Sequence, residues 1–493
     1  MSFANVMKSE SQKKLTENGM VAYNTTNAGA LLDLFAVIGA MRSRSEAEIE
    51  QKFAKAFSED KLLATKMMFY AGNIRGGLGE RRTFKICLNW LARNYPEIIL
   101  KNINLISHFN RWDSLFALEG TRCEPALWEL IRRQLFSDFH EMKKNNPISL
   151  LAKWMPSENT SSKATRNRAL HAAQKLYLTP RNYRRIISAL RRYVDVVERK
   201  MSANEWNEID YETVPSYAMK NYRNAFRKHD NVRMANYEAA LNKGEAKVNA
   251  SVLYPYDLVR EYFQKGTNYH STSLDPIIEN QWKSLPDYIE GENNVVVMAD
   301  VSGSMMSPEG RPMATSIALA IYFAERNKGD YHNLYMTFTS TPHFLSIDEG
   351  ATLAENIHKV IRTDVGFSTN LEAAFMSILS HAKKNNIKSE DMPEALVVVS
   401  DMEIDYCMRE DDWDFLQEME NRFRQFGYEL PRIILWNVEA RNDTYLSQNP
   451  KVAYVSGSSP SSFRSFLGAV NGETGYDIML NTLNDKMYEC VTI

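Results

Sequence analysis

The spacing of apolar residues changes once along the 493-residue chain. From Thr26 to about Lys265, apolar side chains recur every three or four positions, which is the period of one face of an amphipathic helix. Glycine and proline interrupt this pattern at short intervals, as at Gly76 and Pro96. The first part of the chain is therefore predicted to be all-α. Many helices of similar length are compatible with a HEAT-like helical-repeat solenoid, although no fixed-length sequence repeat is evident.

After Gly291 the pattern becomes short β-branched runs that alternate with amphipathic stretches. The strand-like runs are, in chain order, Val295–Met298, Leu334–Phe338, Leu396–Val399, Ile433–Val438 and Val452–Val455. Buried strands that alternate with helices are typical of a parallel, doubly wound sheet. We therefore predict an N-terminal extension over 1–25, a helical-repeat domain over 26–285 and an α/β domain over 291–493.

The charge of the chain follows the same division. Residues 291–493 contain 16 Lys and Arg against 29 Asp and Glu, a net charge of −13, which leaves +11 on residues 1–290. A basic half indicates a polyanionic partner, although opposite charges can also dock the two halves. The four cysteines form no CxxC pair, so neither a disulfide scaffold nor a thiolate zinc site is predicted. We expect an intracellular, cytoplasmic protein without a signal peptide or membrane anchor.

Hydroxyl and carboxylate groups follow the predicted strands at the sheet edge where α/β proteins bind ligands. Asp300, Ser302 and Ser304 come directly after the first strand. Asp401 follows a later strand, and Thr369 lies just before a predicted helix. All five side chains offer hard oxygen donors, and such a set with few charges suits Mg²⁺ better than Zn²⁺. The sequence therefore predicts a Mg²⁺ site, with Mn²⁺ and Ca²⁺ as alternative ions.

The loop Asp300–Ser304, together with Thr369 and Asp401, resembles the metal-ion-dependent adhesion site (MIDAS) of von Willebrand factor A domains. The resemblance implies that the three hydroxyl groups coordinate Mg²⁺, with the two aspartates close to the ion directly or through water. It also implies one open coordination position for an acidic group of a protein partner. Glu403 and Asp405 are interpreted as solvated acids, with membership of an outer shell around the ion as the alternative. Since nuclease chemistry needs a carboxylate-rich metal site, no enzymatic activity is expected.

Several segments of the basic half carry a second resemblance. They are Leu15–Gly19, Leu31–Phe35, Ile74–Arg82, Arg111–Asp113, Ala152–Ser157 and Tyr183–Arg185. These segments resemble a family of uncharacterised bacterial, phage and plant proteins that is similar to the Ro ribonucleoprotein autoantigen. In Ro-like proteins a ring of helical repeats, the TROVE module, precedes an A domain, which is the order found here. The resemblance implies that the helical part binds structured or non-coding RNA.

One predicted helix, Pro180–Met201, supports RNA binding independently of any resemblance. At about 100° per residue, six of its arginines fall on one stripe about 120° wide, opposite the apolar face. The stripe comprises Arg181, Arg184, Arg185, Arg191, Arg192 and Arg199, and the segment before it adds Arg166, Arg168 and Lys175 as candidates. Planar guanidinium groups suit bidentate contact with phosphate. A solvated face, or a docking surface for the acidic half, is the alternative interpretation.

These patterns together predict a non-enzymatic RNA-binding protein with a basic helical solenoid or ring and an acidic, Mg²⁺-binding A domain. One alternative is a protein-interaction adaptor whose metal site binds an acidic partner, and a metal-dependent hydrolase is a third hypothesis. The glycine-rich segment Gly76–Gly79, which precedes two arginines, is interpreted as a tight turn between helices and not as a phosphate-binding loop.

Overall fold

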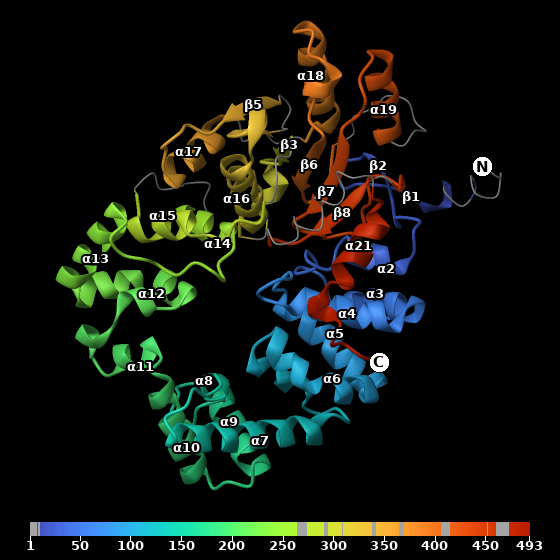
Figure 1. Ribbon diagram of the computed structural model, residues 1–493. Helices are drawn as coiled ribbons and strands as arrows, with labels where there is room; N and C mark the ends of the chain where they lie inside the picture. Colours follow the sequence, from blue (N-terminus) through green and yellow to red (C-terminus); the bar gives the residue numbers. More distant parts are fainter. Residues whose placement is uncertain are drawn as a thin grey trace.

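The computed structural model describes residues 7, 10–263, 274–289, 294–307, 309–337, 342–363, 369–405, 415–450, 452–459 and 473–493. The helical part of the chain starts against the α/β part, runs around a central opening and returns to the α/β part on the other side (Figure 1). The sequence pattern allowed either a solenoid or a ring. The structure is a ring that the α/β domain closes.

The first arm of the ring is formed by the helices between residues 30 and 194. They are α2 (Ala30–Phe35), α3 (Glu46–Glu59), α4 (Lys61–Gly72), α5 (Arg81–Asn94), α6 (Pro96–Phe109), η1 (Trp112–Leu118), α7 (Glu124–Lys143), α8 (Leu151–Trp154), α9 (Lys163–Lys175) and α10 (Pro180–Val194). Local sequence sets their ends. Ser45 and Glu48 form a capping box at α3, and Pro96 begins α6, where its missing N–H is not needed.

The second arm is formed by the helices between residues 197 and 243. They are α11 (Val197–Ser202), η2 (Trp206–Glu208), η3 (Tyr211–Thr213), α12 (Ser216–His229) and α13 (Asn231–Lys243). Asp195 separates the arms, because its left-handed backbone (φ 53°) ends α10. The single helix predicted over Pro180–Met201 is therefore wrong. Aspartate tolerates this conformation better than most residues, and the apolar period continues across the break.

The second arm leads back to the α/β domain through α14 (Pro255–Val259), η4 (Arg260–Tyr262) and α15 (Pro276–Lys283). The α/β domain then contains six strands in the order β5-β4-β3-β6-β7-β8. Their bounds are β3 (Val295–Ala299), β4 (Leu334–Thr337), β5 (His343–Ser346), β6 (Ala395–Ser400), β7 (Arg432–Asn437) and β8 (Ala453–Ser456). All neighbouring strands are parallel except β5, which pairs antiparallel with β4 at the edge. The expected wholly parallel sheet is thus a mixed sheet that is mostly parallel.

Helices cover both faces of this sheet (Figure 1). The remaining elements of the domain are η5 (Gly303–Met306), α16 (Arg311–Arg326), η6 (Gly329–Tyr331), α17 (Leu353–Thr363), α18 (Leu371–Lys384), η7 (Ser389–Asp391), α19 (Phe415–Gln425), α21 (Gly475–Leu483) and η9 (Lys486–Tyr488). Buried strands flanked by helices on both faces explain why the strand sequences read as continuous apolar runs.

An N-terminal hairpin packs against the α/β domain. Its strands, β1 (Lys13–Leu15) and β2 (Val21–Tyr23), pair antiparallel. The Thr16 hydroxyl donates to the Ile404 carbonyl at 2.6 Å, and the Glu17 amide donates to the Glu403 carboxylate at 2.7 Å. These two hydrogen bonds hold the hairpin, which precedes the first arm, against the loop after β6.

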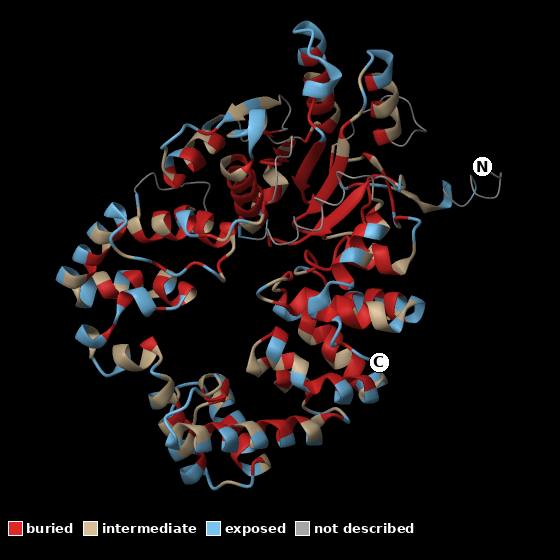
Figure 2. Cartoon of the chain, viewed as in Figure 1, coloured by how far each residue is buried: buried red, intermediate tan, exposed pale blue. Residues whose placement is uncertain are grey.

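Buried residues run without interruption from the first arm into the α/β domain (Figure 2). One hydrophobic cluster extends from Met20 to Leu190 and also includes β-sheet and C-terminal residues such as Leu435 and Val491. The second arm has its own smaller cluster, and α14 and α15 pack with α16 against the other side of the sheet. Cys87 and Cys123 are buried free thiols. In the described part of the chain, no helix is both long and apolar enough to cross a membrane.

Candidate functional site

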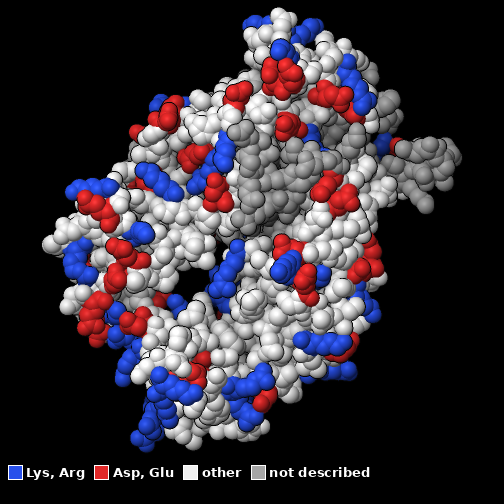
Figure 3. Space-filling model, viewed as in Figure 1, with Lys and Arg blue, Asp and Glu red and all other residues white. Residues whose placement is uncertain are grey.

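The inner face of the ring surrounds a cavity of about 1040 Å³. The space-filling view shows the opening, with Lys and Arg side chains at its rim (Figure 3). Among the described residues that line the cavity, seven are Lys or Arg and three are Asp or Glu. The cations are Arg42, Arg75, Arg81, Arg82, Arg111, Lys153 and Arg311. The cavity is therefore a basic site, and Arg311 shows that the α/β domain contributes to it.

The three acids of the cavity are each engaged by a neighbour within the protein. Glu80, which is 2% exposed, forms an ion pair with Arg42, although burial raises its pKa. The Asp257 carboxylate accepts a hydrogen bond from the Tyr217 hydroxyl. Glu198 lies 3.5 Å from Lys153. None of these contacts involves the remaining cations, so the positive charge of the cavity is only partly offset.

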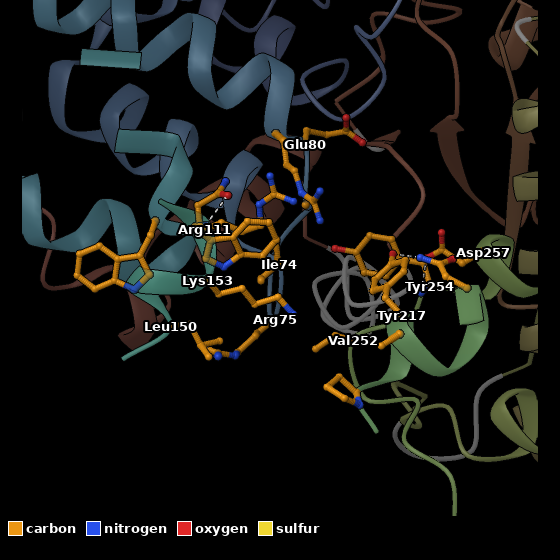
Figure 4. Close-up of a pocket in the computed structure, with 18 of the residues that line it drawn as sticks. Ile74, Arg75, Glu80, Arg111, Leu150, Lys153, Tyr217, Val252, Tyr254 and Asp257 are labelled. Atoms are coloured by element: carbon orange, nitrogen blue, oxygen red, sulfur yellow. Dashed lines mark hydrogen bonds between the residues drawn. The ribbon is translucent and has the colours of Figure 1, made fainter. Parts of the chain in front are cut away.

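Aromatic side chains alternate with these charges on both walls. Figure 4 shows Arg111 and Lys153 of the first arm across the cavity from Tyr217 and Tyr254. The Arg111 guanidinium lies 3.9 Å from the centre of the Trp154 ring and donates to Asp113 at 2.8 Å, so it is held flat against the wall. The aromatic residues that line the cavity are Trp112, Trp154, Tyr217, Tyr222, Tyr254 and Tyr256. Five of these rings are partly exposed and Tyr256 is buried beneath Arg311. Cations interleaved with accessible aromatic rings are the combination that binds single-stranded nucleic acid.

The cavity residues come from segments far apart in the sequence. Sequence reasoning did not assign Arg75, Arg111 or Lys153 to binding. A signal was present, however, because Ile74–Arg82, Arg111–Asp113 and Ala152–Ser157 are among the segments that carry the family resemblance. The structure brings all three to the inner face of the ring.

The predicted arginine stripe lies on the outside of the ring, on α10. Figure 3 shows Lys and Arg side chains gathered at that end of the molecule. Arg181, Arg184, Arg185 and Arg192 are exposed. Arg191 is not free, because its guanidinium donates to carbonyl oxygens of the α8 segment, among them Ala152 at 2.8 Å.

The other predicted RNA contacts are also partly engaged. Arg199 lies beyond the break at Asp195 and pairs with that residue and with Glu205. Lys175 lies 2.6 Å from Glu124, and the two exposed arginines of α9 make weaker contacts. Those two are Arg166, which donates to the Thr160 carbonyl, and Arg168, which lies 3.9 Å from Glu119. None of the nine predicted residues lines the ring cavity.

The predicted metal site lies at the carboxyl ends of β3 and β6. The hydroxyl oxygens of Ser302 and Ser304 are 3.1 Å apart. Asp300 is fully buried and accepts hydrogen bonds from the Ser302 amide at 2.9 Å and from the Ser400 hydroxyl at 2.6 Å. Burial, reinforced by the nearby Asp401 carboxylate, raises the pKa of Asp300 to about 7.

Asp401 is held from two sides, by the Glu403 amide at 3.1 Å and by the Arg441 guanidinium at 2.6 Å. The Thr369 amide donates to the Asp405 carboxylate, which ties Thr369 to the loop after β6. The interpretation as a solvated acid is wrong for Glu403, whereas Asp405 is partly exposed. Both carboxylates accept hydrogen bonds from backbone amides, and Glu403 is 1% exposed because the N-terminal hairpin covers it.

The donor set fits a small hard cation. Mg²⁺ binds oxygen at about 2.1 Å in octahedral geometry, which puts neighbouring ligands about 3 Å apart, close to the observed separation of the two serine hydroxyls. Asp300 and Asp401 are oriented by hydrogen bonds, and a cation would offset their mutual repulsion. No cluster of three or more His, Cys, Asp or Glu suited to a metal occurs among the described residues. The expected neighbours of Thr369, residues 366–368, lie outside the described residues.

Comparison with known proteins adds the following similarities. A domain of unknown function, DUF2828, matches residues 16–111 and 158–294, and a second, DUF7788, matches residues 294–488. An uncharacterised protein, L728, of Acanthamoeba polyphaga mimivirus is 29% identical over 469 residues, which cover 87% of this chain and 80% of the viral protein. The crystal structure of the Deinococcus radiodurans Ro (RSR) protein is similar with a TM-score of 0.47 and 13% identity, over 90% of this chain and 99% of that one.

Proposed function

We propose that this protein binds RNA and that a single-stranded segment of the RNA enters the ring cavity. The observation that carries the proposal is the lining of the cavity, where cations outnumber acids seven to three among the described residues and alternate with six aromatic rings. Lys and Arg neutralise phosphates and release counterions, while the rings stack on bases of any sequence.

The size of the cavity favours a single strand. A volume of about 1040 Å³ is at the upper end of the range of small-molecule pockets and holds a few nucleotides. One turn of a duplex, about 34 Å long, is far larger. A structured part of the RNA would therefore stay outside the ring. The exposed arginines of α10 and α9 are the surface that we assign to it, as the sequence predicted.

The test is binding of fluorescein-labelled oligouridine to the full chain, measured by anisotropy. A cavity variant, Arg75→Glu with Lys153→Glu, should weaken binding about tenfold or more, because two phosphate contacts become repulsive. The matched control is Lys228→Glu with Lys243→Glu, which reverses two exposed charges of the second arm that line no cavity. Wild-type affinity should also fall steeply as salt rises. Equal affinity of the cavity variant and the control variant would contradict the proposal.

We further propose that the α/β domain is a non-enzymatic A domain. Ser302, Ser304 and Thr369 would hold Mg²⁺, with Asp300 and Asp401 as hydrogen-bonded acids close to it. The ion would supply a positive charge that an acidic group of a partner could complete. The hydroxyl separation of 3.1 Å supports this assignment. An adaptor role, in which an acidic protein is the main ligand, is the competing function, and it predicts no binding of oligouridine.

A further inference from the structure

A second cavity, of about 590 Å³, lies in the first arm between α3, α5, η1 and α9. Its wall includes Lys85 and Asn89 from α5, Phe116 from η1 and, at the α9 side, Arg168. This groove does not belong to the inner face of the ring, since these four residues do not line the first cavity.

The groove and the ring cavity are joined by two arginines. Arg81 and Arg82, at the start of α5, line both cavities. The side chain of Arg82 donates to the backbone carbonyl of Arg44 at 2.8 Å, so it is oriented without losing its charge to an acid. A strand that leaves the cavity along α5 therefore passes between two cations as it enters the groove.

Two of the three acids in the wall of the groove pair with arginines outside it. Glu50 pairs with Arg93, and Asp113 pairs with Arg111, which leaves the exposed Glu46 beside the four cations of the wall. The remaining contacts of the groove cations with acids are long, at 3.5 Å for Lys85 with Asp113 and 3.9 Å for Arg168 with Glu119. Pairs at such distances near the surface contribute little, and a phosphate can replace them.

An aromatic ring is also present. Phe116 is half-buried, and the Arg168 guanidinium lies 5.9 Å from its ring centre. A base could stack in this position with the guanidinium on the phosphate beside it. The groove thus repeats, on a smaller scale, the combination of cations and an aromatic face found in the ring cavity.

We propose that this groove is a second binding site for single-stranded RNA, which holds the part of the strand that continues from the ring cavity toward the cations of α9. The inference rests on the proposed function, because it extends the path of the same ligand. It also gives the predicted contact Arg168 a position on that path. An acidic peptide is the competing occupant, but the arginines shared by the two cavities favour one continuous polyanion.

The experiment compares oligouridines of 5, 10 and 15 nucleotides with the full-length chain. The groove variant is Lys85→Glu with Arg168→Glu, two side chains that line only the groove. Wild-type affinity should rise with length. The groove variant should bind the 5-mer within about twofold of wild type and lose about tenfold in affinity for the 15-mer, because only the longer strand reaches the groove. The double variant Lys228→Glu with Lys243→Glu should bind all three like wild type.

The outcomes separate the two proposals. If the groove variant keeps the full gain from 5 to 15 nucleotides, or loses affinity equally for all lengths, the groove is not on the path. If wild type binds no oligouridine, or the cavity variant Arg75→Glu with Lys153→Glu binds like wild type, the proposed function itself fails. A 15-residue polyglutamate that competes with the 15-mer and depends equally on Lys85 would identify an acidic-peptide groove instead.

Crosslinking provides a readout that does not depend on a variant's folding. A 15-mer with 4-thiouridine at successive positions should crosslink, in wild type, first to peptides of the ring cavity and then to peptides that contain residues 85–89 or 116. The absence of any crosslink to those peptides from every position would overturn the inference.

Discussion

The two arms of the ring are anchored in different ways. The first arm shares one hydrophobic core with the α/β domain, and its contact with that domain is further fixed by Lys52, whose ammonium lies 3.1 Å from Asp443. The second arm has a small core of its own, and among the described residues it meets the α/β domain through α14, α15 and Tyr217. Where the arms meet, at Asp195, the contacts are polar, as between Lys153 and Glu198. Stability is therefore concentrated in one half of the ring.

The arm that shares its core with the α/β domain also carries most of the proposed binding surface. The first arm supplies six of the seven cations among the described cavity residues, and it also carries the groove. The second arm supplies Tyr217 and Tyr222 to the opposite wall. Most cations of the cavity thus lie on the arm that shares its core with the α/β domain. Four of the six aromatic rings lie on the second arm or at α14.

The largest effect on stability is expected from a substitution that separates the first arm from the α/β domain. A Cβ at Gly39 would lie 2.5 Å from the carbonyl oxygen of Ser456, so no side chain fits without a backbone shift. Gly39→Val should lower the free energy of unfolding by about 3 kcal/mol. Urea denaturation of the full chain measures this. Ala235→Val, on the exposed face of α13, is the control and should cost less than about 1 kcal/mol. An equal loss in the free energy of unfolding for both variants would show that the contact between Gly39 and Ser456 does not hold the first arm against the α/β domain.

The second arm should be the part that acid loosens first. Burial opposes the charge of Asp275, but hydrogen bonds from Arg227 and Arg223 overcome it and lower its pKa to about 2. Because the folded pKa lies below the unfolded value, the stabilisation, about 2 kcal/mol, is present above about pH 4 and disappears as pH falls toward 2. Hydrogen exchange should show that the amides of α12 and α15 lose protection when the pH is lowered from 5 to 3. The amides of α4 and α5 should keep their protection at both pH values.

Asp275→Asn should reproduce that loosening at neutral pH, since it leaves both arginines without their carboxylate. Protection of the first arm should stay unchanged. If the first arm loses protection at the same pH as α12, the two arms unfold as one unit and their separate cores do not matter.

Metal binding should stabilise the α/β domain and the first arm more than the second arm. If the site holds Mg²⁺, an ion concentration ten times the Kd stabilises the folded chain by about 1.4 kcal/mol. The melting temperature should rise with millimolar Mg²⁺ and should not rise in Asp300→Ala. Because the first arm shares its core with this domain, the added protection should extend to α2 and α4, not to α12. An Asp300→Ala variant that still responds to Mg²⁺ would show that the site is misassigned.

The features that could be predicted from the sequence are those that depend on short stretches of the chain. All five predicted strands exist, because buried β-branched runs leave little ambiguity, and Asp300 and Ser302 lie at the strand end that the parallel sheet predicted. It missed β5, a four-residue edge strand with alternating exposure. It also missed Arg441, which reaches Asp401 from the loop after β7.

The ring cavity was beyond prediction for a different reason. Arg75, Arg111, Lys153 and Arg311 come together only because the ring closes. Closure depends on contacts between residues hundreds of positions apart, such as the Gly39 amide with the Ser456 hydroxyl. The spacing of apolar residues and the composition carry no information on such contacts. The arginines of α10, by contrast, could be predicted to share one face from their spacing along the chain.

The smallest effect on stability should come from that stripe, and it decides whether the first arm also binds RNA on its outer face. Arg181, Arg185 and Arg192 are exposed, and their replacement by Glu should change the free energy of unfolding by less than about 0.5 kcal/mol per site. Arg191 is left intact because burial lowers its pKa and its hydrogen bonds hold α8. A hairpin RNA with a single-stranded tail should bind the triple variant several-fold more weakly, while an oligouridine 5-mer should bind it as it binds wild type. If both ligands bind the variant like wild type, RNA contacts are confined to the cavity and groove, and the stripe is a solvated face.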